Sequence, residues 1–173
     1  MDVFEAIKER RSIRSFTAEA VSDEAVKQLI DAARYAPSAG NTQPLELVVV
    51  RDPEIKRRLS VAALNQMFIQ TASVVFVVCA DVTRSKREYG GRGEKLYSIQ
   101  DTAAATENIL LAAHELGLAT CWVGAFNEKD VAKAINAPKN TKPLAIIPVG
   151  HPAKKPSVPK RRAADEIVHY ETF

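Results

Sequence analysis

The sequence predicts an α+β domain in which helices cover a mixed sheet. This fold class rests on segments with helical periodicity that alternate with apolar runs rich in β-branched residues. The chain's 173 residues are near the usual size of one compact domain. We therefore expect a single domain over residues 1–173, of which 151–173 form an extended, proline-rich tail.

Five segments are expected to be helical. In the segment from Asp2 to about Glu9, apolar residues recur at helical spacing. Ser22 is a suitable N-cap for a second helix, whose apolar stripe continues until Pro37. The other three are expected from Asp52 to about Ala63, from about Leu96 to Leu116, and from Asn127 to Ile135. The Leu96–Leu116 helix is rich in alanine, which indicates burial on several sides.

Four apolar runs are expected to be strands: residues 45–50, 73–80, 118–124 and 144–150. The run 73–80 reads SVVFVVCA and is too continuously apolar for a half-exposed strand. It is therefore expected to be a central strand. Cys79 in this run and Cys121 in the next are expected to be buried thiols of a protein in a reducing compartment.

The charged segment 81–94 is expected to be a long, mobile loop. It contains Gly90, Gly91 and Gly93, and such loops often lie near functional sites. It would serve as a lid. Tyr89 and Tyr97 flank its glycines, and they are expected to pack against the protein rather than stack on a substrate.

Composition narrows the range of partners. No apolar run approaches the roughly 20 residues that a membrane helix requires, and the N-terminus lacks the pattern of a secretory signal. The net charge of +3 is spread along the chain without the aromatic interleaving of RNA-binding proteins. We therefore expect a soluble, cytoplasmic protein with neither a membrane nor a nucleic acid as partner.

Several catalytic chemistries lack their motifs. The three histidines, His114, His151 and His169, are scattered, and the chain contains neither HExxH nor cysteine pairs at the spacing of metal ligands. The GxSxG pattern of serine hydrolases is missing, as are the phosphate-binding patterns GxxxxGK and GxGxxG. No metal site is therefore expected.

A basic cluster follows the first predicted helix. In RRSIR, three guanidinium groups and a hydroxyl lie where the chain can turn and surround a phosphate with charge-assisted hydrogen bonds. Taken alone, the motif fits a solvated basic surface as well as it fits a phosphate site.

Three motifs together resemble the signatures of the nitroreductase family: RRSIRSF, PSAGNTQP and CWVGAF. They span most of the chain. The resemblance implies a nitroreductase-like, three-layer α/β/α fold with a mixed, mainly antiparallel central sheet. It also implies a homodimer with FMN at each subunit junction and a C-terminal extension onto the partner subunit. A weak alternation at Val168 and Tyr170 would suit an added edge strand, although a frayed terminus explains it as well.

The resemblance assigns the FMN phosphate and the pyrimidine edge of the ring to the basic cluster and the tail. The residues are Arg10, Arg11 (mainly through its backbone), Ser12, Arg14, Lys160 and Arg162. Arg161 would replace either tail residue if the register shifted by one. Without a ligand, the tail residues would simply be solvated.

The same resemblance assigns the ribityl chain and the ring to two loops and an amide. The residues are Pro37, Ser38, Asn41 and Gln43, reaching the flavin from the opposite subunit; Val123 and Gly124, approaching the isoalloxazine through their backbone; and Gln66, with Asn65 as the alternative. An N–H at 123–124 would reach N5 of the ring. Without a ligand, the 37–44 segment would be a helix-to-strand turn and Gly124 a turn glycine. Trp122 is expected in the core or at an interface.

The resemblance implies an NAD(P)H-dependent FMN oxidoreductase that reduces nitroaromatics, quinones or related acceptors by a ping-pong mechanism. The cofactors would be FMN, with NADH or NADPH as the electron donor, and no catalytic side chain is assigned. One alternative is another enzyme of the same fold, either a flavin-destroying enzyme that makes a cobalamin precursor or a reductive dehalogenase. The other alternative is a non-catalytic FMN-binding module.

Overall fold

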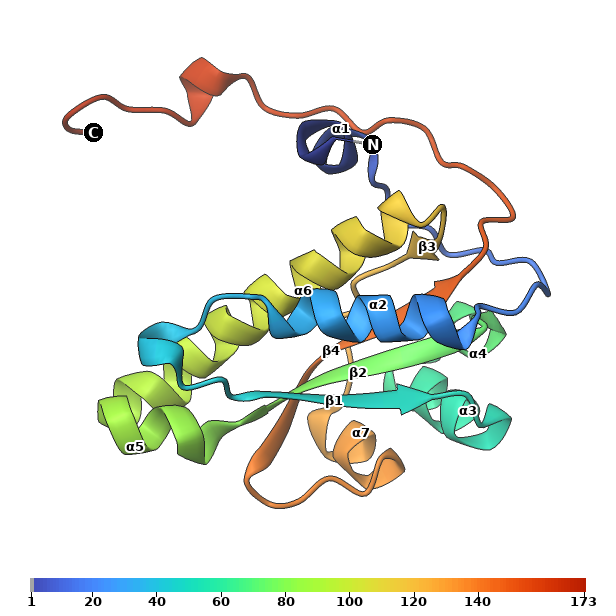
Figure 1. The fold of residues 1–173 in the computed structure, drawn as a ribbon, viewed down its shortest axis with the longest axis horizontal. Helices are drawn as coiled ribbons and strands as arrows, with labels where there is room; N and C mark the ends of the chain where they lie inside the picture. Colours follow the sequence, from blue (N-terminus) through green and yellow to red (C-terminus); the bar gives the residue numbers. More distant parts are fainter. Residues whose placement is uncertain (1) are drawn as a thin grey trace.

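A four-stranded sheet in the order β1-β2-β4-β3 lies between two layers of helices (Figure 1) in the computed structural model, which describes residues 2–173. The strands are β1 (Leu45–Val50), β2 (Val74–Asp81), β3 (Ala119–Thr120) and β4 (Thr141–Gly150). All their ladders are antiparallel. Among the described residues, Ser12 and Thr120 form an isolated parallel bridge. The α+β class and the mainly antiparallel sheet are confirmed.

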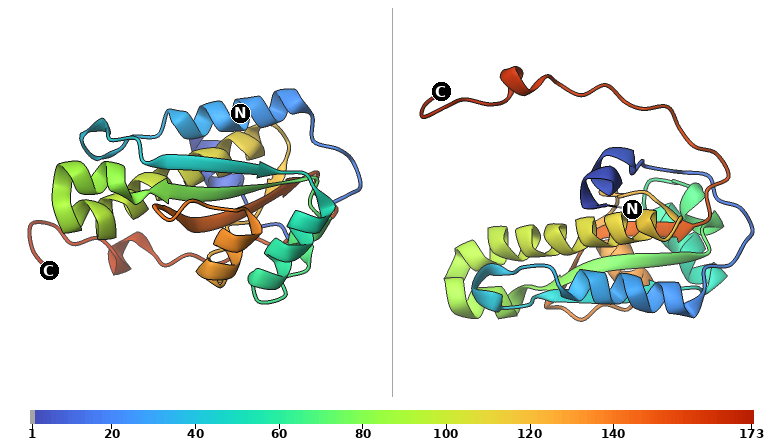
Figure 2. Two further views of the ribbon diagram at one scale, coloured as in Figure 1. Left: turned by 90° about the horizontal axis from the view of Figure 1, so that it is seen from below. Right: turned by 45° about the horizontal axis from the view of Figure 1, so that its top comes forward.

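Strand β2 holds the two helical layers together because both of its faces are buried. Val74, Phe76 and Val78 lie in the core beneath α2 (Asp23–Arg34) and α6 (Ser98–Glu115). Val75, Val77 and Cys79 face the opposite core, which α3 (Pro53–Ala62), α4 (Phe68–Thr71) and α7 (Glu128–Ala134) cover. Figure 2 shows the three layers edge-on. The expected three-layer arrangement and the central position of this strand are confirmed.

Side-chain caps fix the helix starts that the sequence predicts. Oxygen atoms of Asp2, Ser22, Asp52 and Asn127 each accept a hydrogen bond from the backbone N–H three residues later, at 2.8 to 3.2 Å. These bonds begin α1 (Val3–Glu9), α2, α3 and α7. The four predicted starts are therefore confirmed.

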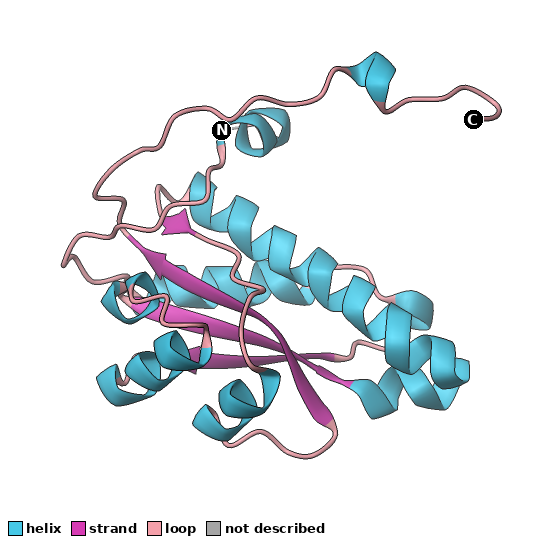
Figure 3. Cartoon of the chain, turned by 180° about the vertical axis from the view of Figure 1, so that it is seen from behind, coloured by secondary structure: helices cyan, strands magenta, loops and turns pink. Residues whose placement is uncertain are grey.

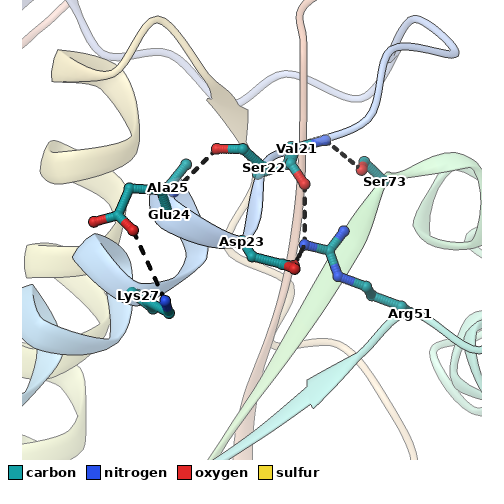
Figure 4. A network of polar contacts seen from close by, with 8 residues as sticks. All are labelled: Val21, Ser22, Asp23, Glu24, Ala25, Lys27, Arg51 and Ser73. Atoms are coloured by element: carbon teal, nitrogen blue, oxygen red, sulfur yellow. Dashed lines mark hydrogen bonds and ion pairs between the residues drawn. The ribbon is translucent and has the colours of Figure 1, made fainter.

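A polar network anchors the start of α2 to the sheet (Figure 4). The Val21 N–H donates to Ser73 Oγ at 2.8 Å, just before β2 begins. Arg51, just after β1, donates to the Val21 carbonyl at 3.0 Å and to Asp23 Oδ1 at 2.9 Å. These contacts satisfy backbone groups at a helix end and hold α2 across two strands.

The expectation of a long, mobile loop at 81–94 is wrong. The segment forms α5 (Val82–Arg92), which continues through a π-helical turn (Gly93–Tyr97) into α6. Asp81 caps α5 by accepting from the Thr83 N–H, and Gly90 supplies a left-handed kink at φ +55°. A Cβ on Gly93 would lie 2.0 Å from the Ser85 carbonyl oxygen. The glycines thus permit a kink and a close contact rather than a lid.

The predicted strand 118–124 is shorter than expected. Only Ala119 and Thr120 form a ladder with β4, and Val123 returns to it through a single bridge to Ile146. Continuing the β3 register places Cys121 opposite Pro148, which has no N–H to donate. The chain therefore leaves the sheet between these points. The other strand and helix predictions hold to within a few residues at their ends.

The C-terminal tail extends away from the body and passes near α1 (Figures 1 and 3). Residues 152–173 are exposed and include a short 3₁₀ turn, Ala164–Glu166. The edge strand expected at Val168 and Tyr170 is not formed within one protomer. Among residues 2–173, no helix is long and apolar enough to cross a membrane.

Replacing Phe76 with alanine should lower the free energy of unfolding by about 3–5 kcal/mol, because the ring is fully buried between β2 and the α2–α6 layer. Urea denaturation measures the change. Val61→Ala, on the exposed side of α3, is the control and should change the same free energy by less than about 1 kcal/mol. Equal effects at the two positions would contradict the assignment of the core.

Candidate functional site

Backbone hydrogen bonds bring three distant segments together beside β3. The Ile13 N–H donates to the Thr120 carbonyl at 2.8 Å. The Thr17 N–H donates to the His151 carbonyl at 2.9 Å, and the Ala153 N–H donates to the Ser15 carbonyl at 3.1 Å. The basic motif therefore runs between the segment leading into CWVGAF and the start of the tail.

A basic hollow lies where the first and last of these segments meet. It has a volume of about 560 Å³ and is lined by Ser12, Ile13, Arg14, Ser15, Lys154, Lys155, Pro156 and Ser157. Three cationic side chains and three hydroxyl groups thus surround one opening. Cationic groups and hydroxyls are the donors that bind a phosphate. We call this opening the basic hollow.

Sequence reasoning missed the two lysines of the basic hollow, Lys154 and Lys155, together with its other tail residues and Ser15. The lysines form a basic pair in HPAKKP, immediately after the last predicted strand. Lys155 Nζ lies 3.5 Å from Glu9 Oε2, so it also ties the tail to α1. The signal that could have identified them was their position at a strand end, where functional groups often lie.

Arg10 and Arg11 sit beside the hollow in different ways. Arg10 Nε is buried without a hydrogen bond and lies 3.6 Å from Glu107 Oε1 on α6. Arg11 is buried, and its Nη1 donates to the carbonyl oxygens of Lys8 and Arg10 at the end of α1. The Arg11 side chain therefore caps a helix, which leaves its backbone as the part that would serve a ligand.

The 37–44 loop has an unusual backbone. It turns through the 3₁₀ segment Ala39–Asn41, and three residues have left-handed φ values: Gly40 at +53°, Asn41 at +55° and Gln43 at +50°. The Gln43 N–H donates to Ser38 Oγ at 3.0 Å. Two of these left-handed residues are not glycine, so the loop is strained.

Within one protomer the 37–44 loop and the basic hollow are not brought together. The loop contacts Asp101 in the first turn of α6, whereas Thr120, which holds the basic motif, follows the other end of that helix (Figure 1). An α-helix of 18 residues is about 27 Å long. The loop and the basic hollow therefore lie toward opposite ends of α6 within one protomer.

A smaller hollow adjoins the loop and contains a buried carboxylate. Its volume is about 220 Å³, and its lining includes Pro37, Ser38, Gln43 and Asp101. Asp101 Oδ1 accepts the Ala39 N–H at 3.0 Å, and Oδ2 is buried without a hydrogen bond. Burial raises the pKa of Asp101, and the hydrogen bond from Ala39 opposes that change.

The amide expected near the ring is engaged within the protomer. Gln66 Nε2 donates to the Ala63 carbonyl at 2.9 Å and to the Ala125 carbonyl at 3.0 Å, so it links the end of α3 to the segment after Gly124. Asn65 is exposed, with φ at +60°. Gln66 therefore lies beside the CWVGAF segment, but its amide nitrogen is already hydrogen-bonded. Asn65 is exposed and is the alternative amide for a contact with the ring.

Only one backbone N–H of the Val123–Gly124 pair suits the expected ring contact. The Val123 N–H donates to the Ile146 carbonyl at 2.9 Å, and the Val123 carbonyl accepts from Ile146 at 3.0 Å. Val123 is buried, whereas Gly124 is exposed. Gly124 is therefore the better candidate for a contact with a ring.

The remaining predicted residues are mostly exposed. Arg162 binds the carbonyl and carboxylate of Glu166 within the tail, and Lys160 is exposed. Neither lines the basic hollow. Tyr89 and Tyr97 pack edge to face, with ring centroids 5.1 Å apart, as a packing role requires. Trp122 is 39% exposed, so a core position is wrong and the interface alternative stays open.

The sequence profile of the nitroreductase family matches residues 7–74 and 60–151. The chain therefore belongs to the nitroreductase family. A relative from Archaeoglobus fulgidus is 39% identical over 147 residues, which cover 83% of this chain and 81% of the relative. An FMN reductase (NADPH) of Bacillus subtilis is 35% identical, with 99% of this chain and 74% of the relative covered.

A solved structure agrees with these sequence matches. The NADPH:FMN oxidoreductase of Vibrio harveyi, in complex with NAD⁺, superimposes with a TM-score of 0.91 and 29% identity. The match covers 99% of this chain and 77% of that one. Nearly all of this chain therefore shares the fold of the Vibrio chain, which carries additional residues.

Asp101→Asn should make the protein relatively more stable as pH rises. Burial raises the pKa of Asp101 in the folded state above its ordinary value of 3.8. As the pH rises past 3.8, ionising the carboxyl group therefore destabilises the folded state relative to the unfolded state, and asparagine avoids this loss. The unfolding free energy of the variant minus that of the wild type should increase from pH 3 to pH 7 in urea titrations. A difference that stays constant or decreases over that range would show that the carboxylate is not destabilised by burial.

Proposed function

We propose that this chain is an NAD(P)H-dependent FMN oxidoreductase that transfers electrons from a reduced nicotinamide to a small organic acceptor. Nitroaromatics and quinones are the acceptor classes. The basic hollow is the observation that carries the proposal, because it joins the family's N-terminal basic motif to the start of the tail. The named relatives in Bacillus and Vibrio support the choice of FMN and NADPH.

The residues around the hollow fit a flavin phosphate. Ser12, Arg14, Lys154 and Lys155 line the opening, and Arg10 Nε is a buried donor without a hydrogen-bond partner. Glu107 Oε1 lies 3.6 Å from this donor without a hydrogen bond, so an anionic ligand could supply the missing bond. We propose that these residues hold the phosphate, and that Lys160 and Arg162 join them when the tail is placed by a partner subunit.

The chain's own task is binding and orientation. Bound FMN would supply the ring that accepts hydride from the nicotinamide, so no nucleophilic side chain is needed. The two cysteines do not offer one: burial raises the pKa of Cys79 to about 12 and also raises that of Cys121. Gly124, Gln66 and the 37–44 loop are the groups that would meet the ring and the ribityl chain.

We propose a homodimer because one protomer leaves both the site and its surface incomplete. The loop and the basic hollow lie toward opposite ends of α6, so a second copy would be needed to bring one of each together. Val3, Phe4 and Ile7 of α1 are each more than half exposed, as are Ile167 and Tyr170 in the tail. Strand β1 is an edge strand to which a tail could add.

The chain is thus proposed as one domain over residues 1–173, with 151–173 wrapping the partner. Two buried, unpaired thiols support a reducing compartment, and we place the protein in the cytoplasm. A non-catalytic FMN-binding module remains the second candidate, because the same phosphate contacts would serve retention alone. A flavin-destroying enzyme or a reductive dehalogenase differs in what becomes of the bound flavin and of the acceptor.

Reduction of bound flavin separates these functions. NADH or NADPH, added anaerobically to the FMN-loaded protein, should bleach the visible flavin absorbance, and an added quinone or nitroaromatic should restore it. Initial rates at varied concentrations of donor and acceptor should then give parallel double-reciprocal lines, because NAD(P)H and the acceptor would bind in turn at the same face of the flavin. Persistent absorbance of oxidised flavin would indicate a binding module. Intersecting lines would contradict the ping-pong mechanism.

Arg14→Ala should weaken FMN binding by about tenfold or more, since it removes a charge-assisted contact from the basic hollow. Fluorescence titration of the FMN-free protein measures the dissociation constant. Arg57→Ala is the matched control, because Arg57 pairs with Glu54 on the surface of α3. If the two variants bind FMN equally well, Arg14 does not belong to the site.

A further inference from the structure

The strained 37–44 loop is closed by its own hydrogen bonds but is held in place by α5 and α6. Internally, the Asn41 N–H donates to the Ser38 carbonyl at 2.9 Å and the Thr42 N–H donates to the Ala39 carbonyl at 3.1 Å. These bonds shape the turn without fixing it to the body. Left-handed Asn41 and Gln43 are unfavourable, Gln43 more than Asn41, and persist only where the surrounding structure determines their conformation.

Contacts from α5 and α6 supply those surroundings. One of them is buried and joins the Thr42 and Ser85 hydroxyl oxygens at 3.4 Å. Asp101 accepts the Ala39 N–H at 3.0 Å, and Arg84 Nε donates to the Thr42 carbonyl at 2.9 Å. A Cβ on Gly40 would lie 2.2 Å from the Tyr89 hydroxyl oxygen, so the Tyr89 side chain packs directly against the loop at Gly40. Arg84 is exposed and Tyr89 is 40% exposed, whereas Asp101 is 9% exposed. Of the two side chains that hydrogen-bond to the loop backbone, the Asp101 carboxylate is therefore the better shielded from water.

The Asp101 carboxylate is costly to the fold at this position. Oδ2 is buried without a hydrogen bond, and burial raises the pKa of the group. A buried polar atom without a partner destabilises a protein, so stability does not account for an acid here. Its one hydrogen bond goes to the loop. What the carboxylate provides is the placement of that loop.

We propose that Asp101 is a positioning residue that fixes the 37–44 loop in the conformation that meets FMN. By accepting the Ala39 N–H, it would determine where Ser38, Asn41 and Gln43 stand relative to the flavin bound mainly by the partner subunit. This inference rests on the proposed function, because it takes the loop to be a flavin contact. Asp101 itself would touch neither flavin nor substrate.

Three variants on the acceptor side test the role. Asp101→Ala removes the acceptor and should raise the FMN dissociation constant at least tenfold. Asp101→Asn keeps an acceptor oxygen for Ala39 and should stay within threefold of the wild type. Thr106→Val is the control, because Thr106 is also buried on α6 and its hydroxyl donates to the Thr102 carbonyl within the helix rather than to the loop. It should also stay within threefold.

A variant on the donor side completes a double-mutant cycle. Ala39→Pro removes the N–H at the first position of the 3₁₀ turn, where the preceding Ser38 is extended, at φ −139° and ψ 150°, and tolerates proline. It should weaken FMN binding as much as Asp101→Ala does. The double variant should be no weaker than either single variant, because both remove the same contact.

Hydrogen exchange of the Ala39 amide gives a readout independent of FMN. The amide should exchange slowly in the wild type and in Asp101→Asn, and at least tenfold faster in Asp101→Ala. A folded Asp101→Ala protein with wild-type FMN affinity would overturn the proposal, as would additive effects in the cycle. If Asp101→Ala does not fold, Ala39→Pro decides by the same criterion.

The same measurements distinguish a failure of the proposed function. A wild type that binds no FMN would refute the flavin assignment. In that event the Ala39 exchange rates still decide the anchor: unchanged exchange in Asp101→Ala would refute it, and faster exchange would leave Asp101 as the anchor of a loop with another ligand.

Discussion

The candidate site depends on the backbone pairing that holds residues 12–17 between Thr120 and the start of the tail. The N–H groups of Ile13, Thr17 and Ala153 form the three bonds that join these segments. The bond from Ile13 ends on the buried Thr120, so it is the one whose loss would leave a buried group without a partner. The three bonds place Arg14 opposite Lys154 and Lys155, residues that lie some 140 positions apart in the sequence.

This pairing also explains the division of labour among the N-terminal arginines. Arg11 turns inward to close α1, which fixes the direction in which the chain enters the site. Arg10 Nε lies 3.6 Å from Glu107 Oε1 of α6 and makes no hydrogen bond, and Arg14 lines the hollow. One arginine is thus used for the fold, and two remain for an anion. The 37–44 loop, toward the other end of α6, is the second half of a site that one protomer does not complete.

Much of the fold follows from local patterns in the sequence. The apolar run of β2 predicts a strand buried on both faces, and the caps at Ser22, Asp52 and Asn127 predict helix starts. Two errors arose where tertiary contacts override composition. The glycines of segment 81–94 suggested a loop, but Gly90 permits a kink in α5, and Gly93, in the π-helical turn, permits a close approach to Ser85. The predicted strand at 118–124 is interrupted opposite Pro148, which local periodicity cannot reveal.

The site was less predictable than the fold because its residues come from distant segments. The basic motif and the 37–44 loop could be identified from their residue types. Lys154 and Lys155 could not, because they reach the basic hollow only through the backbone hydrogen bonds that pair 151–153 with Ser15 and Thr17. Asp101 could not be identified either, because nothing local distinguishes it from the other acids of this alanine-rich helix, Glu107 and Glu115. Its importance lies in one hydrogen bond to a loop 62 residues away.

The affinity of the wild-type protein for FMN, compared with that for riboflavin, tests the phosphate role of the basic hollow most directly. The two ligands differ only in the phosphate, and both are measured by quenching of flavin fluorescence. If the hollow binds the phosphate through several charge-assisted bonds, FMN should bind at least about 100-fold more tightly, and added salt should reduce the difference. Equal affinities would show that the hollow is not a phosphate site.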